Sequence, residues 1–454
     1  MQALLAFAGS RGDAQPGVLL GRELARRGHS VTLAVSPNLV EFAVQQGISA
    51  VPFGLDSGDL LRAQRDDARF RGRNPLRRVQ AVLDLQRRGF AEAAGDLLAL
   101  AGNQFALDGD DAVLVTGMAC EEIAAEVARH HAIPLAALHF FPIRPTRAVP
   151  VLPSGPASRL PAAVHRAGWQ ALTKTRAWAL AAEIAAFRRA AGPGADRTPS
   201  APYTAVQAYD PALFPGIATE LPGEHFTGFP VPLEGIGPRS ASGTTRSGGL
   251  DAELAEWLTE GPAPVYAGFG SMPVADPVAT ESMAREVCRR LGLRLLLVGP
   301  MFRPRIGLDL AVVDQVDHGA VLPLCAAVVH HGGAGTTAAA LRAGVPSVIC
   351  SVQADQPYWG RQLEVLGLGA TAPFAGLTAN RLERLLIRAT APEVVARVAD
   401  YGARFRDDGV ARAADVIESL SAAGQSGTGP VATRPSTAPD RDVREMPTMI
   451  GGVR

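Results

Sequence analysis

The sequence has few cysteines, few aromatic residues, no excess charge of either sign and no long hydrophobic run. Its four cysteines lie far apart, so neither a disulfide framework nor a structural zinc site is expected. The 44 basic and 44 acidic residues balance, which leaves no field to attract nucleic acid. No apolar stretch reaches the roughly 18 residues that span a membrane, and no basic start precedes the first apolar run. Because 47% of the residues are hydrophobic, we expect a globular, cytoplasmic protein.

Short apolar segments alternate with helical patterns in the first half of the chain. The predicted strands are 2–8, 30–35, 48–53, 112–116 and 134–140. Such alternation is typical of a parallel sheet with right-handed crossovers. A helix is predicted from the loop at 9–13 up to Gly28, and the arginine-rich stretch 54–80 is predicted as a surface loop. Helices are expected at 76–101 and 160–191.

A second α/β half follows residues 228–249, which are rich in Gly, Pro and Ser and are predicted as a linker. Its predicted strands are 264–271, 293–299, 327–331 and 345–351. Its predicted helices are 276–291, 335–344, 355–366, 378–390 and 393–421. We therefore expect an α/β protein with domains at 1–227 and 250–421, whose parallel sheets face each other across a ligand-binding cleft. Residues 422–454 are expected to be a disordered tail.

The strongest motif is a strand that runs directly into Gly332-Gly333-Ala334-Gly335-Thr336-Thr337, where a helix begins. Closely spaced glycines let backbone amides approach an anion, and the new helix adds unpaired N–H groups. His331 precedes this turn and can donate a further hydrogen bond. The spacing matches neither a Walker loop nor the dinucleotide fingerprint. The alternative is a tight turn that binds nothing.

A second motif, Asp355-Gln356, follows the strand predicted at 345–351. A carboxylate beside an amide accepts hydrogen bonds from, and donates them to, several hydroxyls, as sugar recognition requires. The alternative role of Asp355 is a helix cap ahead of Pro357.

These two motifs, with the N-terminal GSRGD and the GFGSM at 268–272, resemble the family 1 glycosyltransferases of the GT-B fold. The resemblance is to the bacterial branch that glycosylates vancomycin-type antibiotics, sterols and mycobacterial glycopeptidolipids, and it covers about residues 1–420. It implies two Rossmann-like domains and a last helix that packs back on the N-terminal domain. Lys174 is the only lysine in an Ala-, Gly- and Pro-rich chain, which favours an actinobacterial source.

The resemblance also implies roles for individual residues. Asp13 matches the catalytic base that removes the acceptor proton, and Ser10 and Gly12 share its loop near the donor. The other implied donor-binding residues are Ser271, Val316, His318, His331, Gly333, Gly335, Thr336, Thr337, Asp355 and Gln356. Val316 and His318, with Asp317 between them, hold the base, and Asp355 and Gln356 hold the sugar. No metal and no resident cofactor is implied, because the nucleotide sugar is itself a substrate.

The sequence departs from many eukaryotic relatives, in which a histidine base is partnered by an aspartate. The corresponding later segment, 116–120, has no carboxylate, so Asp13 is expected to act alone or with water. The alternative for Asp13 is a carboxylate that caps the following helix. Asp108 and Asp110 form a D-x-D pattern, but it precedes a strand and is read as a solvated turn.

The expected reaction is inverting and metal-independent. It moves a hexose or deoxyhexose from a UDP- or dTDP-sugar to a hydroxyl of a lipophilic acceptor, such as a glycolipid, lipopeptide, polyketide or sterol-like molecule. The 54–80 stretch is expected to be a solvated face; the alternative is contact with the acceptor or with an anionic membrane at its inner, cytoplasmic side. A monomer or weak dimer is expected. The rival functions are a nucleotide-sugar 2-epimerase and a non-catalytic helper of a glycosyltransferase.

Overall fold

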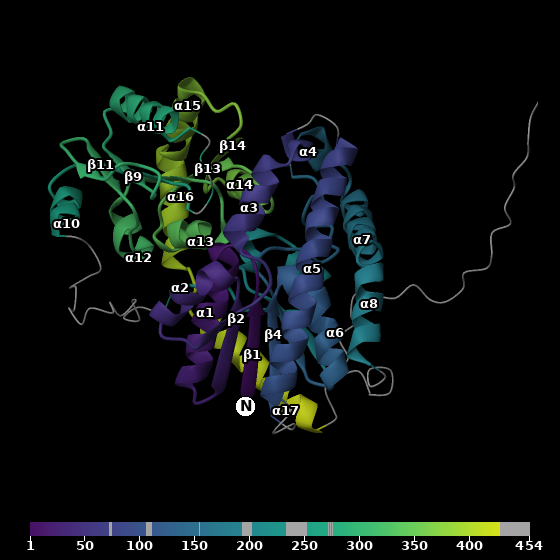
Figure 1. Ribbon diagram of the computed structural model, residues 1–454. Coiled ribbons are helices and arrows are strands. Elements are labelled where there is room, and N and C mark those ends of the chain that lie inside the picture. The colour runs from purple at the N-terminus through teal and green to yellow at the C-terminus, as the bar shows by residue number, and fades with distance from the viewer. Residues whose placement is uncertain are drawn as a thin grey trace, which may run out of the picture.

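The computed structural model describes residues 1–71, 75–105, 111–153, 155–192, 202–232, 252–270, 272, 274 and 276–426. The chain forms two lobes, each built on a seven-stranded sheet with helices on both faces (Figure 1). Neighbouring strands are parallel in both sheets except at one edge. The predicted α/β class is therefore confirmed.

The N-terminal sheet has the strand order β3-β2-β1-β4-β5-β6-β7. Its strands are β1 (Gln2–Phe7), β2 (Ser30–Val35), β3 (Ala50–Pro52), β4 (Ala112–Gly117), β5 (Leu135–His139), β6 (Tyr203–Gln207) and β7 (His225–Phe226). β1 is central because its apolar residues are buried on both faces, and Leu4 pairs with Thr32 on one side and Leu114 on the other.

The C-terminal sheet has the order β10-β11-β9-β8-β12-β13-β14, with only β10 antiparallel to its neighbour. Its strands are β8 (Val265–Gly268), β9 (Leu295–Val298), β10 (Arg305–Ile306), β11 (Leu310–Val313), β12 (Ala327–His330), β13 (Ser347–Ser351) and β14 (Gly369–Pro373). The pattern repeats that of the first lobe, so the strand order diverges between β1 and β4 in one sheet and between β8 and β12 in the other. Ligands bind at such switch points.

Helices cover the two sheets and join the lobes. In the N-terminal lobe they are α1 (Arg11–Arg26), α2 (Val40–Gln45), α3 (Ser57–Asp66), α4 (Ala68–Arg71), α5 (Pro75–Phe105), α6 (Glu121–His131), α7 (Ala162–Ala179), α8 (Ala181–Ala191) and α9 (Ile217–Glu220). They continue with α10 (Ala252–Thr259), α11 (Pro277–Leu291), α12 (His318–Val321), α13 (Ala334–Arg342), α14 (Gln356–Leu366), α15 (Ala379–Ala389), α16 (Pro392–Ala403) and α17 (Gly409–Ser426).

The last helix, α17, lies against α1 at the base of the N-terminal lobe (Figure 1). Glu418 accepts hydrogen bonds from Arg27 and His29, both at 2.7 Å, and Ile417 is buried in the core between α1 and the sheet. The described part of the chain thus ends on the lobe in which it began.

Several predicted elements are wrong in detail. The stretch 54–80 is not a loop: α3 and α4 occupy it, because Asp56 caps α3 by accepting hydrogen bonds from the N–H groups of Gly58 and Asp59. The helical stretch predicted at 393–421 consists of two helices, α16 and α17. It breaks before Gly409, whose backbone packs so close to Phe229 that a Cβ atom would lie 2.3 Å from the Phe229 oxygen. Periodicity also missed β6, β7, β10, β11 and β14.

Two segments of the predicted organisation fall partly outside the described residues. The predicted linker is described only up to Pro232, and of the predicted tail only 422–426 is described, as the end of α17. All four cysteines are free and buried. In the described ranges, no helix combines the length and apolar character needed to cross a bilayer.

Candidate active site

The start of α13 is an open helix N-terminus. β12 ends at His330, and the chain turns at Gly332, where φ is +94° and a Cβ atom would lie 2.6 Å from Ile349 Cγ2. Only glycine fits this turn. Gly333 is the N-cap residue, and no side chain caps the helix. The N–H groups of its first turn are therefore available to an anion.

His331 lies beside this helix start with a free hydrogen-bonding atom. Its Nδ1 is buried and has no partner among the described residues. Burial lowers the pKa of His331 to about 4, so the imidazole is neutral near pH 7. The absence of side chains at Gly270 and Gly333 makes room for the ring, since Cβ atoms there would lie 3.1 Å and 2.6 Å from it. A neutral imidazole can donate one hydrogen bond to a ligand oxygen.

The three predicted residues that follow in α13 are not equivalent. Thr337 is buried, and both its N–H group and its hydroxyl donate to the Gly333 carbonyl oxygen, at 3.0 Å and 2.9 Å. It therefore stabilises the turn. Gly335 is exposed and Thr336 is half-buried, which leaves these two at the open face of the helix start.

Asp355 and Gln356 stand at the start of α14, directly after β13. The preceding Ala354 has a φ of +55°, a strained conformation for a non-glycine residue. Gln356 is buried, and its Oε1 accepts hydrogen bonds from the N–H groups of Val352 at 2.8 Å and Gln353 at 3.1 Å. Asp355 Oδ2 accepts one from Trp359 Nε1 at 2.9 Å. Both side chains are thereby fixed by their own loop and helix.

Asp13 belongs to the first turn of α1, not to a loop. The helix begins at Arg11, so Gly12, which is exposed, also lies in that turn. Ser10 donates to Asp13 Oδ2 from its N–H group at 2.8 Å and from its hydroxyl at 2.9 Å. This reciprocal cap fixes the carboxylate at the end of β1. Burial raises its pKa, and the bonds from Ser10 hold part of that rise back.

Electrostatic contacts join the two lobes at this point. Burial raises the pKa of Asp355 to about 6, and the negative charge of Asp13 adds to the rise. Burial lowers the pKa of His318, and the positive charge of Arg11 lowers it further. Ala334 at the start of α13 packs against the N-terminal core that contains Ala14. The starts of α1, α13 and α14 therefore meet at one junction between the lobes.

The segment predicted to hold a base lies on the same side of the second sheet. Val316 is half-buried, and Asp317 caps α12 by accepting a hydrogen bond from the Gly319 N–H at 2.8 Å. His318 Nε2 is hydrogen-bonded to the Tyr266 hydroxyl at 3.0 Å. Ser271, predicted to bind the donor, lies outside the described residues, as do Asp108 and Asp110.

Sequence patterns missed the aromatic contact that joins the lobes. Tyr358 and Trp359 of α14 pack among aromatic rings of the N-terminal lobe: Phe141 lies 4.6 Å from Tyr358 and Phe214 lies 5.5 Å from Trp359, between ring centroids. Tyr358 also donates from its hydroxyl to the Val151 oxygen at 2.6 Å. The letters Tyr-Trp after Asp355-Gln356-Pro357 are a signal for such packing, but not for its partners.

A carboxylate near Asp13 was also missed. Glu122 lies two residues beyond the 116–120 segment and forms an ion pair with Arg176 of α7 at 2.6 Å. The charges of Asp13 and Glu122 both act on the buried thiol of Cys120. Burial raises the pKa of this thiol to about 12, and the two negative charges add to the rise. Within the described ranges, no three His, Cys, Asp or Glu side chains are grouped to hold a metal ion.

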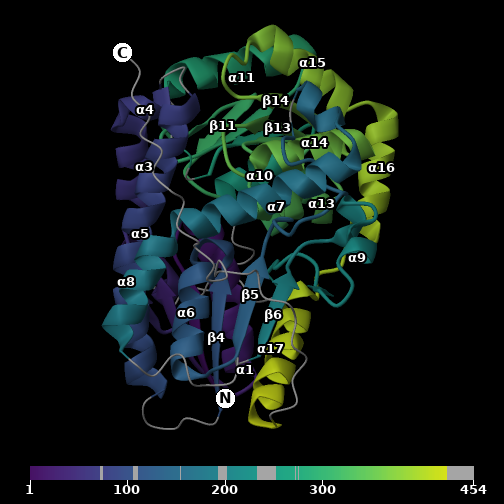
Figure 2. The same cartoon turned by 90° about the vertical axis from the view of Figure 1, so that its right-hand side faces the viewer.

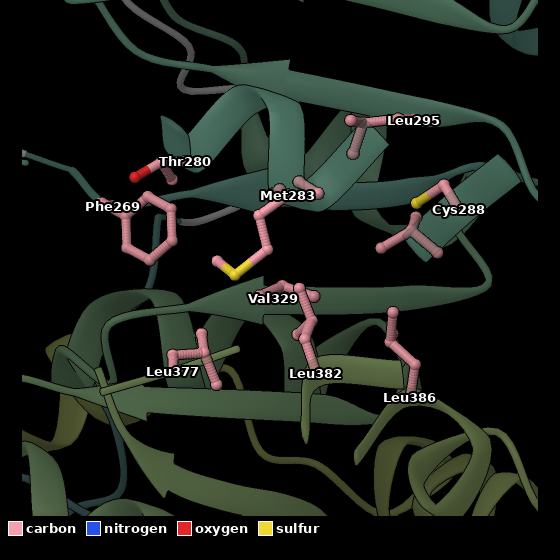
Figure 3. Close-up of a pocket in the computed structure, with 12 residues that line it drawn as sticks. Phe269, Thr280, Met283, Cys288, Leu295, Val329, Leu377, Leu382 and Leu386 are labelled. Atoms are coloured by element: carbon pink, nitrogen blue, oxygen red, sulfur yellow. The ribbon is translucent and has the colours of Figure 1, made fainter. Parts of the chain in front are cut away.

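A separate apolar cavity belongs to the core of the C-terminal lobe. It has a volume of about 10 Å³ and lies between β8, β9, β12, α11 and α15, lined by residues such as Phe269, Met283 and Leu382 (Figure 3). A space of this size barely holds one water molecule, and its walls offer almost no polar group. It is a packing defect, not a substrate site.

Comparisons with known proteins find relatives over nearly the whole chain. Residues 305–418 match the family described as the erythromycin biosynthesis protein CIII-like C-terminal domain. An uncharacterised glycosyltransferase of Mycobacterium bovis is 37% identical over 92% of this chain and 98% of its own length. The vancomycin aglycone glucosyltransferase of Amycolatopsis orientalis is 29% identical over 92% of this chain and 97% of its own length. The structure of the glycosyltransferase VinC in complex with dTDP superposes with a TM-score of 0.57 at 19% identity, over 94% of this chain and 100% of that one.

The relatives, the fold and the open helix start beside Asp355 all point the same way. The Mycobacterium bovis relative is named a glycosyltransferase, and its 37% identity to this chain extends over nearly its whole length. The chain therefore belongs to the bacterial branch of the family 1 glycosyltransferases of the GT-B fold.

Proposed function

We propose that this glycosyltransferase moves a hexose or deoxyhexose from a UDP- or dTDP-sugar to a hydroxyl of a lipophilic acceptor, with inversion. One observation carries the proposal. The uncapped start of α13, with the unpartnered His331 Nδ1, meets the carboxylates of Asp13 and Asp355 at the junction of the lobes. The dTDP in the VinC structure supports a thymidine diphosphate donor.

At the donor end, the diphosphate rests on the amides of Gly333, Gly335 and Thr336, with a hydrogen bond from His331. Negative charge grows on the diphosphate as its bond to the sugar breaks. Amides and a dipole that are already in place stabilise that charge without reorganising. Ser271, Val316 and His318 complete the contacts to phosphate, ribose and base, and Ser10 and Gly12 border the donor from the other lobe.

At the acceptor end, Asp13 removes the proton of the attacking hydroxyl. Burial raises the pKa of Asp13, which makes the carboxylate a stronger base than that of an exposed aspartate. The hydroxyl attacks the anomeric carbon on the face opposite the diphosphate, so the configuration inverts. Asp355 and Gln356 hold the sugar hydroxyls during this step.

The acceptor is proposed to bind the N-terminal lobe, beside Phe140 and Phe141 and the α7–α8 helices. The vancomycin aglycone glucosyltransferase is named for an aglycone acceptor, which supports an aglycone as the acceptor here. We propose a cytoplasmic monomer or weak dimer.

Product analysis tests the proposal against its rivals. The protein is incubated with UDP- and dTDP-sugars, with and without a panel of polyketide, sterol, lipopeptide and glycolipid acceptors, and the products are separated and weighed by mass spectrometry. A product whose mass equals that of the acceptor plus one transferred sugar residue supports the proposal. An isomerised donor without acceptor indicates a 2-epimerase, and an unchanged donor throughout indicates a helper protein.

The charge on the leaving diphosphate is proposed to be met by amides and His331 alone. We therefore expect an excess of EDTA over any metal present to leave the transfer rate unchanged within about twofold. Loss of activity that magnesium restores would contradict this part of the proposal.

A further inference from the structure

Helix α7 exposes a row of apolar side chains to solvent. Val164, Ala167, Ala171 and Trp178 are all exposed, at spacings of three and four residues with Thr175 between the last two, so they share one face of the helix. Trp178 is 75% exposed and Val164 44%. Leu172, at the margin of this row, is 52% exposed. We call this row with Leu172 the α7 stripe.

The α7 stripe is additional to the face by which the helix packs on the protein. On the inner side, His165 and Trp169 are buried, and Trp169 Nε1 donates to the Val149 oxygen at 2.9 Å. Gly168 lies so close to Val151 that a Cβ atom would meet its side chain at 2.7 Å. The helix is therefore already anchored, and the exposed stripe is not needed for the core.

The segment that contains the stripe carries positive charge only. The sequence has no aspartate or glutamate between Glu126 and Glu183. Arg159, Arg166 and Lys174 are exposed, and none forms an ion pair with another described residue. Two arginines of α3 and α4 differ, because Arg62 pairs with Asp59 and Arg69 pairs with Asp67. The acid-free segment is thus at α7, not in the arginine-rich stretch.

The segment leading into α7 extends the apolar surface towards the junction of the lobes. Leu152 and Leu160 are 57% and 45% exposed. The same segment contacts α14: Tyr358 donates to the oxygen of Val151, just before Leu152, and Arg361 donates to the Ser158 oxygen. Figure 2 shows α7 across the front of the molecule, between the two lobes, with no helix in front of it.

We propose that the α7 stripe and the segment before it dock this enzyme on the surface of a bilayer that contains anionic lipid. A helix with Trp178 and Val164 on one exposed face, and with Leu172 and two unpaired cations exposed on its flanks, is suited to lie in the interfacial plane. The cations meet the lipid headgroups. A second copy fits less well, because a two-fold contact through this face would place Arg166 and Lys174 near their own copies without any acid.

The docking explains how a lipophilic acceptor reaches the site, and this consequence rests on the proposed function. The docked face adjoins α14, whose N-cap residue is Asp355, so an acceptor dissolved in the bilayer enters beside the donor. The docking itself is measured without donor or acceptor, so it stands or falls separately from the transfer reaction.

Tryptophan fluorescence gives a direct test. Of the four tryptophans, Trp169, Trp257 and Trp359 are 4%, 8% and 0% exposed, so Trp178 alone reports on the surface. With vesicles of phosphatidylglycerol and phosphatidylcholine, we expect blue-shifted emission, loss of acrylamide quenching and co-sedimentation. No binding of the full chain to these vesicles overturns the proposal.

Substitutions separate lipid docking from self-association through the same face. Leu172→Ser with Trp178→Ser should weaken vesicle binding at least tenfold. Arg166→Gln with Lys174→Gln should weaken it several-fold at low salt only. Leu308→Ser is the matched control, because Leu308 is 94% exposed on the other lobe and its loss should leave binding unchanged. Equal loss in the control, unchanged binding in the Leu172/Trp178 variant, or a dimer that this variant dissociates overturns lipid docking.

Discussion

The two lobes use the same feature, a helix that begins at the switch point of a parallel sheet, in opposite ways. α1 follows β1, and its N-terminus is capped from within, because the Asp13 carboxylate accepts hydrogen bonds from the N–H group and the hydroxyl of Ser10. α13 follows β12 and stays open, with no side-chain cap and with His331 Nδ1 unpaired beside it. A carboxylate in the first turn repels a phosphate, whereas bare amides attract one. This difference supports the proposed division of roles, with proton removal in one lobe and stabilisation of the leaving group in the other.

The largest effect on turnover is expected when Asp13, the carboxylate in the first turn of α1, is replaced by a residue that cannot accept a proton. Asp13→Asn keeps the size of the side chain but removes the proton acceptor. Turnover should fall roughly 100-fold or more, the usual contribution of a general base, while nucleotide affinity stays within a few-fold. Steady-state kinetics and calorimetry measure the two quantities.

Asp13→Asn also weakens the cap of α1, so a control is needed that removes a helix cap elsewhere. Thr378→Val removes the hydroxyl that caps α15 by accepting from the Arg381 N–H, on a helix at the far end of the C-terminal lobe (Figure 1). It should cost about 1 kcal/mol of stability without loss of turnover. If Asp13→Asn behaves like this control, Asp13 is only a cap.

At the open terminus, His331→Ala should weaken the binding of the nucleoside diphosphate about tenfold, as expected for one hydrogen bond to a charged group. Calorimetry with dTDP and UDP measures it. His165→Ala is the matched control, because His165 is also buried with an unpaired Nδ1 but lies in α7. Equal affinities for the two variants would contradict a phosphate contact by His331.

A smaller effect is expected at Asp355, which the lobe contact orients through Trp359. Trp359→Phe keeps the aromatic packing but removes the N–H bond that lowers the pKa of Asp355 from a still higher value. The carboxylate exists above its pKa of about 6 and is lost as the pH falls through it. The variant should therefore move the acid limb of the kcat/KM profile to higher pH.

The control for this shift is Trp257→Phe, which removes a similar bond, from Trp257 Nε1 to the Gly307 oxygen at 2.7 Å, far from Asp355. It should leave the pH profile in place. An unmoved limb in Trp359→Phe would show that Asp355 is not the group that titrates.

The smallest effect is expected where the last helix lies on the first. Glu418→Gln weakens bonds to Arg27 and His29 and should cost about 0.5–1 kcal/mol in denaturant unfolding at pH 7. His29 and Arg27 lower the pKa of Glu418, so this stability is lost as the pH falls through that pKa. Asp415→Asn, at a more exposed partner of Arg27, should cost less. A larger cost for Asp415→Asn would contradict the ranking.

Much of the fold followed from local patterns. β2 spans the predicted 30–35 and α14 lies within the predicted 355–366, because apolar periodicity and helix caps are set by neighbouring residues. The short edge strands β7 and β10 were not predicted, because a strand of two residues is too short to show a periodic pattern. The prediction for 54–80 is wrong because arginine content resembles that of a loop, although Asp56 marks a helix start.

The sequence alone was enough to predict the turn at GGAGTT, to single out Asp355-Gln356 and, through its resemblance, to name the family that the comparisons show. Only the tertiary structure decided that Asp13 caps α1, that its charge acts on Asp355, and that Trp359 links Asp355 to the aromatic residues of the other lobe. These relations join residues far apart in the chain or depend on burial. Local sequence encodes neither distance across a chain nor exclusion of water.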